Sequence, residues 1–488
     1  MPSGDALSAP HRQWQRSRLR PQPAVISRPT PVRPSTSATT YLLVVLLYLT
    51  MIAIDVIRKV TGISGNSISV VYVITILIYI KFFLLRVSPT RKVPRYLSIS
   101  LVLLSLWCLI EAVVQRIPPE MALLGWASYV FFVPLVYIGA DLTADQRRAE
   151  KALRLVAIAG ALIGLGAIAS ALLGQSAPTP LQPIIPAVGF HSFNGGNIYL
   201  APSIFATAEE AAEHLLVALF AWAALAQMRW SRLRYSTLAI LGVLIIGGLI
   251  ATARRADIIV AVAGILTLVA VNNVFSSKAT QLRPRSASRA NGRLSAGLLL
   301  AITCSIATVF LLGADKLTTF LASGSPGSRL SLMFSSTNPD SLIGQGTGTS
   351  TQGADLLGAT SFYSYVGQKV YISYLINGRL FITAEGGLTK TWLELGLVGV
   401  ILYAAVFLCV LGPALSSVRH LDNVGRTLIV LTLALGIIFL KGHQSLDDPL
   451  VQPLFWLAAG GVWGRLRPQV QELQRMPEAT QGTADVSA

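Results

Sequence analysis

The short stretch Thr252-Ala-Arg-Arg-Ala-Asp257 contains the residue types that point most directly to chemistry. It separates two apolar runs, so it predicts a tight turn at a membrane surface. Arg254 and Arg255 carry planar guanidinium groups, whose paired N–H donors match the oxygens of a phosphate group. The pair therefore predicts an anion site. Snorkelling toward lipid headgroups, or an ion pair with Asp257, is the structural alternative.

Three carboxylates and a histidine open another apolar run, at Glu209, Glu210, Glu213 and His214. Acidic residues in the first turn of a helix interact favourably with its dipole, and capping accounts for one or two of them. The cluster holds more polar groups than capping needs. Glu209 and His214 are therefore candidate binding residues, with capping as the alternative.

A third polar stretch, residues 384–399, leads into an apolar run late in the chain. Glu385 and Lys390 are expected at the outer end of the predicted span and Trp392 follows them. Glu394 is expected deeper in the membrane. A carboxylate near a cation-rich mouth can take a proton from a hydroxyl group. Glu385 is the candidate base, with a helix cap as its alternative. Glu394 is predicted to make a structural hydrogen bond.

Other charges receive structural interpretations. Asp55 and Glu111 lie near the ends of apolar windows and are interpreted as interfacial charges, because a charge at bilayer depth is costly. Residues 441–448 are interpreted as a surface ion-pair cluster. The cysteines show no spacing typical of a metal site, and no metal or cofactor is expected.

The composition indicates how these residues are positioned. Of 488 residues, 53% are hydrophobic and 12% are charged, whereas a soluble domain carries about 25% charged residues. This excludes an ordinary soluble enzyme and predicts an all-α polytopic membrane protein with about twelve transmembrane helices. The windows are 40–57, 67–85, 97–115, 121–140, 153–173, 208–227, 236–252, 256–275, 296–314, 391–413, 426–441 and 449–464. The last two are short, and a re-entrant pair is their alternative.

The distribution of charge predicts the orientation. Residues 1–39 and 465–488 are expected to be disordered cytoplasmic tails on a membrane domain over 40–464. With both termini inside, most Lys and Arg fall on the inner side, so the net charge of +17 reflects orientation and no nucleic-acid partner is expected. Two long loops, about 174–207 and 315–390, then lie on the outer face, where we expect function.

These stretches resemble the O-antigen ligase and O-antigen polymerase superfamily of bacterial envelope glycosyltransferases. Residues 252–260 are similar to its Ser-Arg-Gly-like element, with Arg255 at the family arginine and Arg254 at the serine. Residues 343–348 are similar to the Gly-x-Gly element of its large loop. The family also has a histidine and an asparagine ahead of two spaced glycines. Gly396 and Gly399 match those glycines, which places Glu385-Gly386 at the His-Asn pair.

The chain departs from the family pattern at two places. Glu385 replaces the histidine that serves as the family base, and both groups can accept a proton. A second family arginine precedes a segment that residues 203–209 resemble, yet no arginine lies between 174 and 207. Arg254, Arg329 and Arg379 are the candidates to supply that charge.

The resemblance implies a metal-independent transferase of the bacterial inner membrane. Its donor would be a polyprenyl-pyrophosphate-linked saccharide, and its acceptor a hydroxyl group of a glycan or lipid. Arg255 and Arg254 would bind the pyrophosphate, and Glu385 would deprotonate the acceptor. Other polysaccharide-assembly proteins are expected partners beside the lipid bilayer. Further substrate-binding candidates are Glu209, His214, Arg379, Lys390 and Trp392.

Two other classes of function fit the sequence. A transporter or flippase of an anionic or amphipathic solute would suit twelve spans, although no repeat relates the two halves. A non-catalytic assembly protein would bind the same lipid-linked glycan without needing Glu385. Loss of turnover with binding retained in a Glu385→Gln variant would separate the enzyme from such a binder.

Overall fold

The computed structural model describes residues 38–61, 69–84, 95–183, 190–193, 196–228, 234–277, 342–349, 360–366, 369–376, 379–382, 387–441 and 448–466. All of them belong to one unit, residues 36–488. Glu385, the predicted span 296–314 and nearly all of both predicted tails lie outside the described residues.

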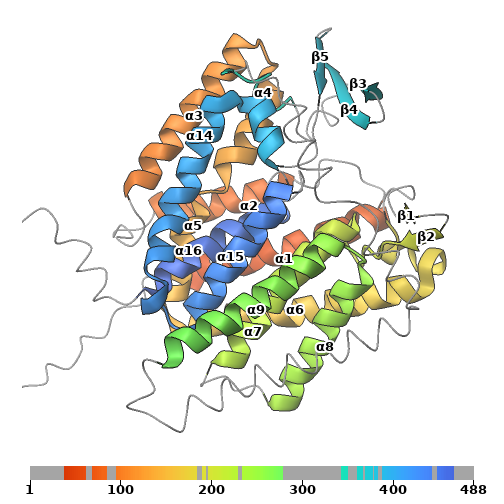
Figure 1. The fold of residues 1–488 in the computed structure, drawn as a ribbon, viewed down its shortest axis with the longest axis vertical. Helices are drawn as coiled ribbons and strands as arrows, with labels where there is room; N and C mark the ends of the chain where they lie inside the picture. The colour runs from red at the N-terminus through yellow and green to blue at the C-terminus, as the bar shows by residue number, and fades with distance from the viewer. Residues whose placement is uncertain are drawn as a thin grey trace, which may run out of the picture. The chain divides into compact units, whose positions relative to one another are not determined.

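Helices dominate the described part of the chain (Figure 1). The α-helices are α1 (Ala38–Thr61), α2 (Ser69–Tyr79), α3 (Arg95–Val114), α4 (Pro119–Trp126), α5 (Leu135–Ala144), α6 (Gln146–Leu173), α7 (Ala208–Gln227), α8 (Tyr235–Ala251), α9 (Arg255–Ser277), α14 (Gly387–Ser416), α15 (Asn423–Lys441) and α16 (Gln452–Arg465). Short π-helical segments, η2 (Ile80–Leu84) and η3 (Ala127–Phe131), follow α2 and α4. The short 3-10 helices are η4 (Gly174–Ser176), η5 (Thr179–Leu181) and η8 (Val418–His420).

Seven helical stretches among the described residues are long and apolar enough to cross a bilayer, and two more are apolar but shorter. The prediction of a multi-pass helical membrane protein is therefore confirmed at this level. Eleven of the twelve predicted windows fall on helices. The total of twelve spans, and the side on which the termini lie, stay predictions.

Two small antiparallel sheets, which the sequence analysis did not predict, lie in the long loops. In the first loop, β1 (Phe190–Phe193) pairs with β2 (Gly196–Tyr199), with Phe190 opposite Tyr199. In the second loop, β3 (Thr360–Val366), β4 (Lys369–Ile376) and β5 (Arg379–Ile382) form a sheet in the order β3-β4-β5. The strands are thus confined to the connections between helices.

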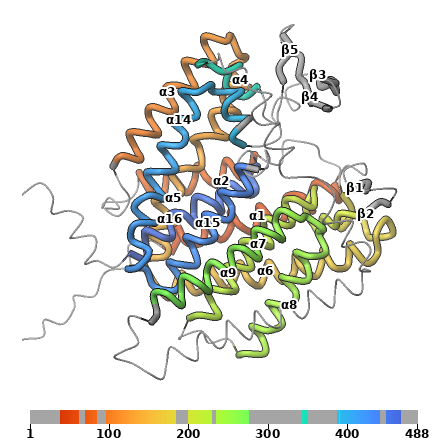
Figure 2. The backbone as a smooth tube through the Cα atoms, in the orientation of Figure 1, coloured from red at the N-terminus to blue at the C-terminus, as the bar shows by residue number. Residues whose placement is uncertain are grey.

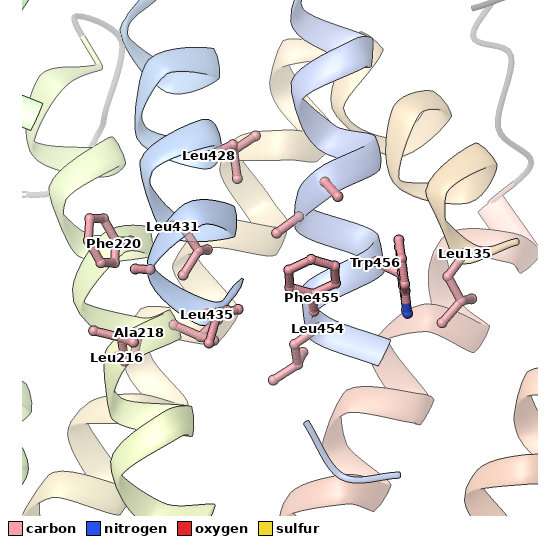
Figure 3. Packing of buried hydrophobic residues seen from close by; sticks show 14 of the residues in the cluster. Leu135, Leu216, Ala218, Phe220, Leu428, Leu431, Leu435, Leu454, Phe455 and Trp456 are labelled. Atoms are coloured by element: carbon pink, nitrogen blue, oxygen red, sulfur yellow. The ribbon is translucent and has the colours of Figure 1, made fainter. Parts of the chain in front are cut away.

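Helix α7 forms the centre of the helical core. Every residue from Ala211 to Gln227 is buried, as expected for a helix that is apolar on all sides. It packs against α6, α8, α9 and α15, and the backbone trace shows it beside α6 and α9 (Figure 2). Phe220 and Ala218 of α7 lie beside Leu431 and Leu435 of α15 (Figure 3).

Glycines allow helices α5 and α16 to pack closely. Helix α16 packs along α5, where a Cβ atom on Gly460 would lie 2.0 Å from the carbonyl oxygen of Val136. On the facing helix, a Cβ atom on Gly139 would lie 2.2 Å from the oxygen of Leu457. Small residues at such crossings let helix backbones approach within the membrane, where apolar burial gives no advantage over lipid.

A Gly460→Ala variant should therefore be destabilised by about 1–3 kcal/mol, because backbone atoms cannot move aside as a side chain can. Gly412→Ala is the matched control, since nothing lies within 4 Å of a Cβ atom at that helical position. Thermal unfolding of the purified protein in detergent would measure both. An unchanged midpoint for Gly460→Ala would contradict the close contact.

Candidate functional site

Charged residues from four separate segments meet where helices begin and end, and we name this group the rim cluster. Its members come from the last turns of α1, the start of α7, the turn between α8 and α9 with the first turn of α9, and the turn before α16. They are Asp55, Arg58, Glu209, Glu210, Arg254, Asp257 and Asp448. Four of them, Glu209, Glu210, Arg254 and Asp257, belong to the two stretches that the sequence analysis treated as candidate sites, and Arg254 contacts both Glu209 and Asp257.

Arg254 is the centre of that contact. One of its terminal guanidinium nitrogens pairs with Oε1 of Glu209, and its Nε lies 3.8 Å from Oδ2 of Asp257. The turn that carries it is tight, with Ala253 at a φ of 54°. Ala253 leads through Arg254 into α9, which begins at Arg255. The ion pair with Asp257 is present as the structural interpretation expected, but Glu209 ties the same guanidinium to α7.

The acidic residues at the start of α7 have two roles: one caps the helix and another forms an ion pair. Thr207 and Glu210 form a capping box: the Glu210 amide donates to Thr207 Oγ1, and the Thr207 amide donates to Glu210 Oε2, each at 3.3 Å. Glu209 instead faces Arg254. Capping therefore accounts for Glu210, whereas the binding role of Glu209 stays a prediction.

His214 lies inside the bundle and is fully buried. Its Nδ1 is 3.0 Å from the carbonyl oxygen of Glu210, and its ring lies 4.4 Å from that of Phe205 between centroids. Its Nε2 has no hydrogen-bond partner among the described residues. The structure thus places this predicted binding residue one turn below the rim cluster.

The last turns of α1 hold residues whose importance the sequence did not reveal. Asp55 was expected to be an interfacial charge, yet it is fully buried. It accepts hydrogen bonds from Arg58 at 3.0 Å and from the Ala206 amide at 2.8 Å. Lys59 donates to the carbonyl oxygens of Pro180, Ser203 and Phe205. The interfacial interpretation of Asp55 was wrong because the loop before α7 folds over it.

Asp448 closes the rim cluster from the turn before α16. Burial raises the pKa of its carboxyl group from 3.8 to about 7. The Leu450 amide, which donates to its Oδ1 at 2.8 Å, and Arg58 oppose that rise, while Asp55 and Glu209 add to it. No group of residues able to hold a metal ion occurs in the described part of the chain.

A second cluster surrounds the Gly-x-Gly segment, and we name residues 342–349 the glycine loop. The amides of Gln345 and Gly346 donate to the carbonyl oxygens of Leu393 (2.6 Å) and Glu394 (3.1 Å) in α14. Trp107 donates to the next carbonyl, that of Leu395. These donors satisfy carbonyls near a break in α14, where Gly396 is non-helical with φ 62° and ψ −171°.

Two buried glutamates hold this arrangement in place. Glu111, expected at an interface, is fully buried and accepts the Gly344 amide at 2.8 Å. That interpretation was wrong because the glycine loop covers the end of α3. Glu394 accepts the hydroxyl of Tyr129 at 2.7 Å, in agreement with its expected structural hydrogen bond. Lys390 was expected at the outer end of this stretch, and the structure buries it one turn before Glu394.

The remaining predicted residues are placed only in part. Trp392 is half-buried on α14, and Arg255 is half-buried at the first position of α9. Arg379 begins β5, and its side chain is outside the described part. The comparison with protein families finds no matching model, and the comparison with curated proteins finds no match either.

The shifted pKa of Asp448 predicts a pH dependence of stability. Between pH 4 and 7 this aspartate is ionised in the unfolded chain but protonated in the folded protein. Its contribution to folding is therefore full below about pH 4, falls as the pH rises, and stays constant above about pH 7. An Asp448→Asn variant keeps an acceptor for the Leu450 amide and should lose this part of the pH dependence.

Thermal unfolding in detergent from acid to neutral pH would measure the effect for both proteins. The difference in midpoint between the variant and the parent protein should grow in favour of the variant as the pH rises. Parallel curves at every pH would contradict the raised pKa.

Proposed function

We propose that the chain is a ligase or polymerase of a bacterial envelope polysaccharide. It transfers a saccharide from a polyprenyl-pyrophosphate carrier to a hydroxyl group of a glycan or lipid acceptor. The reaction takes place on the outer face of the inner membrane.

One observation supports this proposal above the others: the segments that carry the family resemblance come together in pairs. Residues 203–209 and 252–260 meet through the ion pair between Glu209 and Arg254. Residues 343–348 and 390–399 meet through the backbone hydrogen bonds of the glycine loop. Segments that only anchored independent loops would have no reason to pair in this way.

Arg254 and Arg255 are suited to the leaving group. Both lie at the start of α9, a helix of 23 residues whose N-terminal amides attract negative charge. Glu209 and Asp257 fix the guanidinium of Arg254 in one orientation. An arginine so positioned can stabilise the charge that develops on the pyrophosphate without reorganising during the reaction.

The proposed glycosyl transfer needs a base for the acceptor hydroxyl and a cationic group that stabilises the leaving pyrophosphate. The acceptor oxygen forms a bond to the anomeric carbon while the bond from that carbon to the pyrophosphate oxygen breaks. The pyrophosphate leaves with the electron pair of that bond. The proton of the acceptor hydroxyl passes to Glu385, which remains the proposed base on the strength of the resemblance.

A transporter or flippase is the second candidate, and the break in α14 at Gly396 favours it. Transporters bind solutes and ions at discontinuous helices, where unwound carbonyls are available. Here the carbonyls of Leu393, Glu394 and Leu395 already accept protein donors. The carbonyls near the break therefore bind the glycine loop and Trp107, and this weakens the argument for an ion site.

Arg255→Ala and Arg254→Ala should each lower glycan transfer by at least ~10²-fold, because each removes a donor to the developing charge. Glu209→Gln should have a smaller effect, because it leaves both guanidinium groups in place. Arg419→Ala is the control, since Arg419 is exposed beside His420 in η8, away from the rim cluster. Complementation of a deletion strain, with the amount of each variant in the membrane measured, would test all four.

The deletion strain itself separates the two reactions when surface glycans and lipid-linked saccharides are measured in the same cells. Loss of long chains with accumulation of single lipid-linked repeats identifies a polymerase. Long lipid-linked chains that are never attached identify a ligase. Full transfer by both arginine variants, or unchanged glycans and carriers in a strain without a redundant homologue, would contradict the proposal.

A further inference from the structure

A groove runs between the end of α3 and the start of α4. Leu109 and Val113 of α3 and Leu123 and Trp126 of α4 are among its lining residues, and its volume is about 390 Å³. Leu109, Val113 and Leu123 are 61%, 69% and 63% exposed. Because α3 and the α4–α5 stretch are both candidate membrane spans, the groove faces hydrocarbon, and its natural occupant is apolar.

A cation stands at the end of this groove. Arg116 follows the candidate span that ends at Val114 and precedes the span that begins at Pro119. The residue is exposed, and its side chain forms no ion pair within the described part of the chain. A guanidinium just beyond a span lies at the depth of lipid headgroups, where phosphate is its complementary partner.

The local backbone is held in the form that places Arg116 there. Its φ of 54° is uncommon for a residue with a side chain. Amide hydrogen bonds from Gln115 to Glu111, from Arg116 to Val113 and from Ile117 to Ala112 keep the turn closed. A left-handed residue that is not glycine is costly, so the turn depends on this bonding and on its packing.

The glycine loop forms the support behind the groove. Thr347 donates to the carbonyl oxygen of Cys108, a lining residue, at 3.0 Å. Gly346 has a φ of 118°, and a Cβ atom there would lie 2.5 Å from the side chain of Ile117. The glycine loop therefore braces two of the residues that line the groove.

We propose that this groove binds a hydrocarbon chain of an anionic phospholipid whose phosphate pairs with Arg116. The apolar lining receives the chain, and the guanidinium selects the charged headgroup. This lipid site does not depend on the proposed transferase function. Because the glycine loop contacts the lining residues Cys108 and Ile117, the bound lipid would also stabilise the position of that loop.

The test uses the full chain with the photo-crosslinking residue benzoylphenylalanine in place of Leu123, on the groove wall. The matched control carries the same residue in place of Leu162, which is 67% exposed on α6. Each protein is reconstituted in vesicles with equal amounts of phosphatidylglycerol and phosphatidylcholine, and the crosslinked lipids are identified by mass spectrometry. We expect a several-fold excess of phosphatidylglycerol at position 123 and no such excess at position 162.

Two further substitutions separate the charge from the groove. Arg116→Gln should lower the excess at position 123 to the level at position 162, whereas Arg147→Gln, at an exposed arginine of α6, should leave it unchanged. Ala122→Phe should fill the groove and reduce crosslinking of both lipids. Equal labelling at positions 123 and 162 in the parent protein, or an excess that survives Arg116→Gln, would overturn the proposal.

Discussion

The buried end of α1 is the constraint on which the rim cluster depends. A carboxylate taken out of water must find donors, and Asp55 finds them in Arg58 and in the backbone before α7. Lys59 is a cation and needs acceptors instead, and it donates to three carbonyl groups of the first long loop. Together they fix where that loop ends and where α7 begins. The position of Glu209, and through it the orientation of Arg254, follows from this anchoring.

The same physical rule applies where the glycine loop meets α14. A helix broken at Gly396 leaves carbonyls that must be satisfied within the membrane domain. The glycine loop supplies amides to Leu393 and Glu394, and it can approach so closely because a Cβ atom on Gly344 would lie 2.1 Å from the oxygen of Glu394. A segment distant in sequence thereby becomes part of the helical core, and the long loop gains a fixed anchor.

Hydropathy alone predicted most helices, because a membrane rewards long apolar runs whatever their neighbours are. It could not predict the polar contacts. Arg254 and Glu209 are 45 positions apart, and nothing in either stretch specifies the other. Asp55 and Glu111 sit near the ends of apolar windows, so sequence reasoning placed them at an interface. Each carboxylate is buried because a loop distant in sequence folds over it. The hydropathy pattern around the carboxylate does not indicate which loop will do so.

The charge balance of the rim cluster adds a condition to the proposed chemistry. Glu209 and Asp257 form ion pairs with Arg254, and Asp55 forms one with Arg58. Protein carboxylates therefore already neutralise these arginines before a pyrophosphate binds. An anionic ligand must either share these guanidinium groups or replace a carboxylate partner. Asp448, with its pKa near 7, can lose its negative charge by taking a proton instead. Binding of a pyrophosphate would favour that protonation, because a neutral Asp448 removes one repulsive charge from the site. Under the proposed function, proton uptake and donor binding are therefore linked in this cluster, and the surplus of carboxylates acts as part of the site.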